Sequence, residues 1–132
     1  MHATGTFEVK LNPMTPEDET GGAAIGRLSI NKQFFGDLVA TSVGQMVAIR
    51  TATEGSAGYV AMELVTGKLD GRSGTFALQH SGTANRNATQ LSVTVVPDSG
   101  TGELVGLAGQ MQIIIDEGKH LYEFDYVLAE AA

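Results

Sequence analysis

The chain has 132 residues, a formal net charge of −7 and no cysteine. Residues 1–132 are expected to form a single domain, because this length buries enough apolar surface for one core. The acidic balance opposes nucleic-acid binding, and the lack of cysteine excludes disulfides, thiolate metal sites and a cysteine nucleophile. No leader pattern opens the chain and no apolar run approaches a membrane span. We therefore expect a soluble, cytoplasmic protein with no membrane partner.

Short runs of alternating apolar and polar residues predict eight β-strands and no substantial helix. Seventeen glycines against three prolines fit strands that are joined by turns. One long acidic loop is expected between Pro13 and Gly22, around the run Pro16-Glu17-Asp18-Glu19. In chain order, the expected strands span residues 4–11, 25–34, 38–50, 58–69, 72–82, 89–96, 103–116 and 119–128.

The turn Asp70-Gly71 fixes the register of one hairpin, because Asp-Gly between alternating runs favours a two-residue turn. If Leu69 pairs with Arg72, Glu63 and His80 become diagonal neighbours on one face. That face carries Tyr59, Ala61, Glu63, Val65, Phe76, Leu78 and His80.

Glu117-Gly118 specifies the last hairpin in the same way. One face of this hairpin is polar and the other is apolar and aromatic, so the second is predicted to point inward. The inward face carries His120, Tyr122, Phe124 and Tyr126 opposite Ile115, Ile113, Met111 and Gly109.

An open sheet of eight long strands, with no helix to cover it, would leave its apolar face and two edges in water. Closing the sheet into a barrel buries the apolar face and pairs the two edge strands. The predicted fold is therefore all-β, a single eight-stranded antiparallel barrel, with a two-sheet β-sandwich as the alternative. Its interior would hold side chains or one small ligand. The expected core residues are Phe7, Val9, Leu28, Ile30, Phe76, Met111, Ile113 and Phe124.

The run from Gly67 to Phe76, continuing through Gln79-His80-Ser81-Gly82, resembles an uncharacterised bacterial family with a domain of unknown function. The resemblance extends over roughly residues 4–128. It implies a barrel like that of plant allene oxide cyclase, and it implies no activity and no catalytic residue. Later runs that carry it are Ser99-Gly100-Thr101-Gly102-Glu103-Leu104, Gly106-Leu107, His120-Leu121-Tyr122 and Asp125-Tyr126.

Polar side chains are expected to gather at one mouth of the barrel, which we predict to be its functional end. Strand lengths place His80, His120 and Tyr59 at this mouth, with Glu63 and Tyr122 a little deeper. A carboxylate among apolar residues needs a partner, so Glu63 and His80 are a candidate acid–base pair. A purely structural contact is the alternative. Tyr59, His120, Tyr122 and Tyr126 are the candidate ligand-binding residues.

Three functions remain open from the sequence. The first is a small-molecule-binding barrel with a mainly apolar ligand in its lumen. The second is a cofactor-independent cyclase or isomerase that uses Glu63 and His80, and the third is a structural subunit with a filled core. No metal-ligand spacing joins the histidines, so no metal or cofactor is expected. Apolar residues on both faces of strand 58–69 suggest a homodimer.

Overall fold

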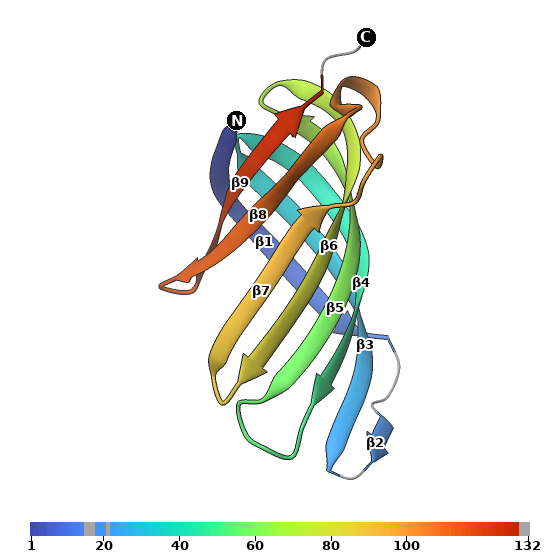
Figure 1. Ribbon diagram of the computed structural model, residues 1–132, viewed down its shortest axis with the longest axis vertical. Coiled ribbons are helices and arrows are strands. Elements are labelled where there is room, and N and C mark those ends of the chain that lie inside the picture. Colours follow the sequence, from blue (N-terminus) through green and yellow to red (C-terminus); the bar gives the residue numbers. More distant parts are fainter. Residues whose placement is uncertain (15–17, 21, 130–132) are drawn as a thin grey trace.

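The computed structural model describes residues 1–14, 18–20 and 22–129, and nearly all of them lie in β-strands (Figure 1). Among these residues, no helix is long and apolar enough to cross a membrane. The elements are β1 (His2–Pro13), β2 (Asp18–Thr20), β3 (Ala23–Gly36), β4 (Leu38–Arg50), β5 (Ala57–Leu69), β6 (Arg72–Asn85), β7 (Ala88–Val95), the 3₁₀ turn η1 (Gly102–Leu104), β8 (Leu107–Asp116) and β9 (Lys119–Leu128).

The strands follow the order β1-β9-β8-β7-β6-β5-β4-β3-β2, and β1 also pairs with β3. This second pairing closes the sheet, so eight strands form the barrel wall, and the three-residue strand β2 pairs with the first three residues of β3. Closure gives β1 a partner on both sides. The predicted eight-stranded antiparallel barrel is confirmed, and the two-sheet sandwich is wrong.

Both predicted hairpin turns are present. Asp70 and Gly71 have φ of 49° and 82°, and Leu69 pairs with Arg72. Positive φ at both turn residues matches the twist of the flanking strands. The Glu117-Gly118 turn has the same form, and a third lies at Arg86-Asn87, which carried no Asn-Gly or Asp-Gly signal.

Two segments differ from the expected strand pattern. The strand expected at 103–116 begins at Leu107, because η1 and the positive φ of Gly106 precede it. Within the expected loop Pro13 to Gly22, β1 continues to Pro13 and β2 occupies 18–20. Residues 15–17 and 21, and with them Pro16 and Glu17 of the acidic run, lie outside the described residues.

Aromatic side chains fill one end of the barrel, including Phe34, Phe76 and Phe124. The hydroxyl group of Tyr122 accepts a hydrogen bond from Leu38 N at 2.9 Å and donates one to Phe35 O at 2.8 Å. Of the expected core residues, Phe7, Ile30, Phe76, Met111 and Phe124 are buried, whereas Val9, Leu28 and Ile113 are half-buried.

The wall is weakest between β7 and β8. Only Val93 with Met111 and Thr94 with Gln110 are paired there. Beyond these pairs the two strands diverge, as their lower parts show in Figure 1. The barrel wall is therefore closed at its aromatic end, whereas toward the other end β7 and β8 are separated. We call this separation the seam between β7 and β8.

Candidate functional site

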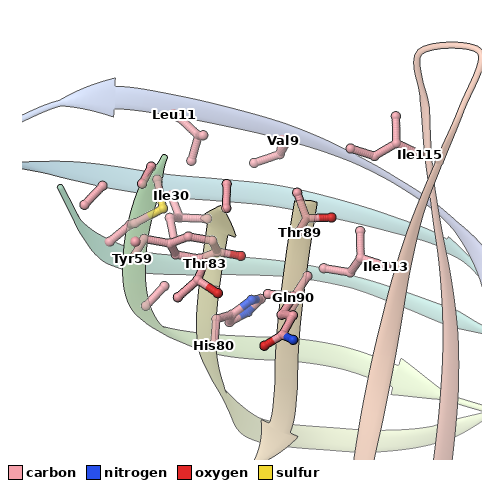
Figure 2. A pocket seen from close by; sticks show the side chains of 18 of the residues that line it. Val9, Leu11, Ile30, Tyr59, His80, Thr83, Thr89, Gln90, Ile113 and Ile115 are labelled. Atoms are coloured by element: carbon pink, nitrogen blue, oxygen red, sulfur yellow. The ribbon is translucent and has the colours of Figure 1, made fainter. Parts of the chain in front are cut away.

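A pocket of about 510 Å³ lies in the part of the barrel that the aromatic core leaves unfilled. Its walls are mainly apolar, with Val9, Leu11 and Ile30 on one side (Figure 2). The pocket is also lined along the seam between β7 and β8, by residues 89–91 of β7 and by Ile113 and Ile115 of β8. A volume of this size suits a small organic molecule.

Three buried charged or polar side chains meet at the inner end of the pocket. Nζ of Lys32 lies 2.8 Å from Oε2 of Glu63, and Nε2 of His80 lies 2.7 Å from the same oxygen. The side chains of Lys32, Glu63 and His80 are 7%, 0% and 5% exposed. Lys32 and His80 line the pocket, whereas Glu63 lies behind them.

The register of the strands explains why these side chains converge. Lys32 of β3 is directly opposite Ser42 of β4, and Glu63 of β5 is opposite Gly44, two residues further along β4. His80 of β6 is opposite Ala61, two residues from Glu63, so four neighbouring strands each place one polar side chain at this level. The lack of a side chain at Gly44 leaves space for Glu63, because a Cβ at Gly44 would lie 2.8 Å from Cβ of Glu63.

The electrostatics favour a charged Glu63 in spite of its burial. Burial raises the pKa of the Glu63 carboxyl, but the hydrogen bond with His80 and the charge and hydrogen bond of Lys32 outweigh burial and lower it. Nζ of Lys32 also lies 4.9 Å from the ring centre of Phe7 and 5.8 Å from that of Phe34. The faces of these aromatic rings attract a positive charge.

Two buried polar atoms in this layer lack a partner among the described residues, namely Oε1 of Glu63 and Oγ of Ser42. Buried polar groups in proteins are normally hydrogen-bonded to protein or to ordered water. The layer therefore has unused hydrogen-bonding capacity directly beside a pocket.

The charge of the pocket lining is opposite in sign to that of the whole chain. Lys32, Arg50, His80 and His120 line the pocket, and within the described ranges no Asp or Glu does so. The chain as a whole carries 15 acidic and eight basic residues. The pocket is thus an apolar cavity with basic groups, set in an acidic protein.

The geometric expectations for Glu63 and His80 are confirmed, because both point inward and form a hydrogen bond. Tyr59 and His120 line the same pocket as His80, in agreement with their predicted position at one mouth of the barrel. His120 also packs on Phe7, with ring centres 5.1 Å apart. Burial raises the pKa of Tyr59, and the negative charge of Glu63 raises this pKa further.

The expected position of Tyr122 and Tyr126 in the pocket is wrong. Both are buried in the filled end, where the hydroxyl group of Tyr126 donates a hydrogen bond to Asp70. The physical reason is the stagger of the strands, because the short hairpin β8–β9 sits toward the filled end. Among the expected aromatic and imidazole residues of β9, only His120, near the turn, reaches the pocket.

Lys32 is the functional candidate that the sequence reasoning missed. It alternates with Leu28, Ile30 and Phe34 on one face of β3, so an inward Ile30 already implied an inward Lys32. A lone lysine in a strand usually faces solvent. Only the cross-strand position of Glu63 shows that this lysine has a buried partner.

The arrangement provides one ammonium donor, Lys32, and one imidazole, His80, whose Nε2 is held by Glu63. In the part of the chain that is described, no three His, Cys, Asp or Glu side chains are grouped to hold a metal ion. A histidine oriented by a buried carboxylate is suited to hydrogen bonding or proton transfer at a bound molecule.

Comparisons with known proteins agree with this fold. A family model described as a protein of unknown function (DUF3224) matches residues 3–126. The chain is similar to the crystal structure of a DUF3224 protein of unknown function from Shewanella oneidensis MR-1. That protein is 47% identical, the match covers 99% of this chain and 98% of the other, and the TM-score is 0.95. No curated protein matches the chain.

Proposed function

Because this chain belongs to the DUF3224 family of proteins of unknown function, we propose a function from the geometry of its own pocket. The barrel binds one small, mainly apolar molecule, and an anionic group at one end of that molecule lies against Lys32 and His80. The proposal assigns binding to the parted end of the barrel and stability to the aromatic end.

One observation carries this proposal: an apolar pocket, with no carboxylate among the described residues of its lining, leads inward to the buried ammonium group of Lys32 and the buried imidazole of His80. Apolar walls favour an apolar body, because its burial removes hydrocarbon surface from water. Charge-assisted hydrogen bonds are about twice as strong as neutral ones, so an ammonium group in a dry site favours an anionic acceptor.

The placement of Glu63 supports binding over catalysis by this carboxylate. Glu63 lies behind the pocket lining, and Lys32 and His80 both hold its Oε2. Its role in the proposal is therefore to position the Lys32 ammonium group and the His80 imidazole. The unfilled pocket also argues against a structural subunit whose barrel is filled throughout.

Two related dyes provide the test. N-phenyl-1-naphthylamine is an uncharged apolar fluorophore, and 1-anilinonaphthalene-8-sulfonate adds one sulfonate to the same framework. We expect each dye to bind at one site per folded chain. The sulfonate should bind about tenfold more tightly, which corresponds to about 1.4 kcal/mol.

Two tryptophan variants locate the site. Ala48 lines the pocket, so Ala48→Trp should fill it and abolish binding of both dyes. Val127 is exposed on β9 away from the pocket lining, so Val127→Trp should bind both dyes like the wild type. Near-ultraviolet circular dichroism must show native packing in both variants, because partly folded chains bind such dyes non-specifically. Absence of binding to the folded wild type, or equal binding to both variants, would overturn the proposal.

A further inference from the structure

The acidic residues of this chain are distributed very unevenly around the barrel. Strands β3, β4, β5 and β6 together contain one acidic residue, Glu63, and its side chain is buried. The other 14 of the 15 Asp and Glu residues fall outside these four strands in the sequence. The outer surface of four neighbouring strands is therefore free of negative side chains.

Apolar side chains occupy the middle of this surface. Val60, Met62 and Leu64 of β5 are 56%, 49% and 50% exposed. Leu64 is paired with Val43 and Val60 with Val47, so the apolar residues are contiguous across β4 and β5. We call this set, Val43, Val47, Val60, Met62 and Leu64, the β4–β5 face. Contiguous exposed apolar groups of this kind mark interaction surfaces.

The polar residues beside Met62, at the centre of the β4–β5 face, are uncharged. Met62 lies between Gln45 of β4 and Gln79 of β6 in the strand register. An amide side chain carries both a donor and an acceptor, so each glutamine can hydrogen-bond to an identical residue. The nearby basic residues, Arg27 opposite Val47 and Lys68 beyond Leu64, lie at the border of the face.

We infer that a second copy of this chain covers the β4–β5 face in a twofold symmetric dimer. Two copies with a net charge of −7 repel each other through most of their surfaces. The outer surface of β3, β4, β5 and β6 carries no negative side chain, so contact through this surface avoids the repulsion. A twofold interface requires a self-complementary surface, and an apolar centre with amide neighbours has that property. The inference does not depend on the proposed ligand.

The dimer also has a consequence for the pocket. Glu63 and His80 project inward from β5 and β6, whose outer residues would lie in or beside the interface. Association would thus brace the wall that carries Glu63 and His80, while the seam between β7 and β8 stays outside the β4–β5 face.

Sedimentation velocity with purified full-length chain tests the inference. The wild type should sediment as a species of twice 13.8 kDa. Met62→Glu places a negative charge at the centre of the face and should weaken self-association at least tenfold. Leu64→Gln removes apolar contact without a charge and should weaken it less.

Val127→Glu is the matched control, because Val127 is 62% exposed but lies on β9. It should sediment like the wild type. Circular dichroism of the variants should match that of the wild type, since all three side chains point outward. A wild type that stays monomeric at every concentration reached would overturn the inference. So would a dimer that survives Met62→Glu, or one that Val127→Glu dissociates.

Discussion

Nζ of Lys32 and Oε2 of Glu63 lie 2.8 Å apart inside the barrel, although 31 residues separate them in the sequence. Both side chains are nearly excluded from water, so water cannot replace either partner. The ion pair therefore links the stability of β3 and β5 to the position of the Lys32 ammonium group in the pocket.

Removal of one partner of this pair should be costly. Lys32→Met leaves the buried Glu63 carboxylate with His80 alone, and we expect a loss of about 3–5 kcal/mol in the free energy of unfolding. The double variant Lys32→Met/Glu63→Leu removes both charges and should be more stable than Lys32→Met alone. Urea denaturation of these two variants and of Glu63→Leu gives the values that a double-mutant cycle compares. Strictly additive effects of the two substitutions would contradict a coupled pair.

Acid should selectively weaken the protein through Glu63. The pKa of this carboxyl is lowered in the fold, so its contribution is fully present above its usual value of 4.5. The contribution is then lost as the pH falls through the lowered pKa. We expect Glu63→Gln to be less stable than the wild type at neutral pH, with a difference in the free energy of unfolding that narrows as the pH falls below 4.5. A difference that stays constant over this range would show that the carboxylate is not stabilised by its partners.

The three tyrosines should resist alkali in the folded state. Burial raises the pKa of Tyr59 and of Tyr122, and burial with the hydrogen bond to Asp70 raises the pKa of Tyr126 to about 12. The unfolded chain gives up these protons first, so stability should fall as the pH rises above 10. Ultraviolet absorbance follows phenolate formation.

A matched variant tests the contribution of Asp70 to this titration. Asp70→Asn keeps a side-chain acceptor for the Tyr126 hydroxyl and tolerates the positive φ of this turn position. It should bring the pKa of Tyr126 closer to 10, because the negative charge is lost. Ionisation of Tyr126 near pH 10 in the folded wild type would contradict the observed environment.

Gly5 should be intolerant of a side chain at the filled end of the barrel. A Cβ at Gly5 would lie 2.0 Å from the carbonyl oxygen of Phe35 and 2.6 Å from the hydroxyl oxygen of Tyr122. We expect Gly5→Ala to cost about 1–3 kcal/mol through overpacking. Gly58→Ala is the control, because its nearest neighbour would be 3.8 Å away. Thermal unfolding compares the two, and an equal loss in both would contradict the close approach at Gly5.

Strand alternation, turn chemistry and the need to close an uncovered sheet were sufficient to predict the barrel and part of its site. Asp70-Gly71 fixed the register of β5 with β6, and that register alone placed Glu63 beside His80. The same argument could not place Lys32, because its contact with Glu63 spans two strand pairings that no two-residue turn specifies. The stagger of β9 against β1 was equally absent from local patterns, so the depth of Tyr122 was misjudged.

Nitrogen-15 NMR of the histidine side chains tests the central claim most directly, because the chain has three histidines in different places. His80 and His120 line the pocket, whereas His2 is exposed and hydrogen-bonded to Asp125. Titration of the folded wild type with 1-anilinonaphthalene-8-sulfonate should shift the ring nitrogens of His80 most, those of His120 less and those of His2 not at all. Saturable binding of the dye with unchanged His80 resonances would contradict the placement of the anionic end at Lys32 and His80.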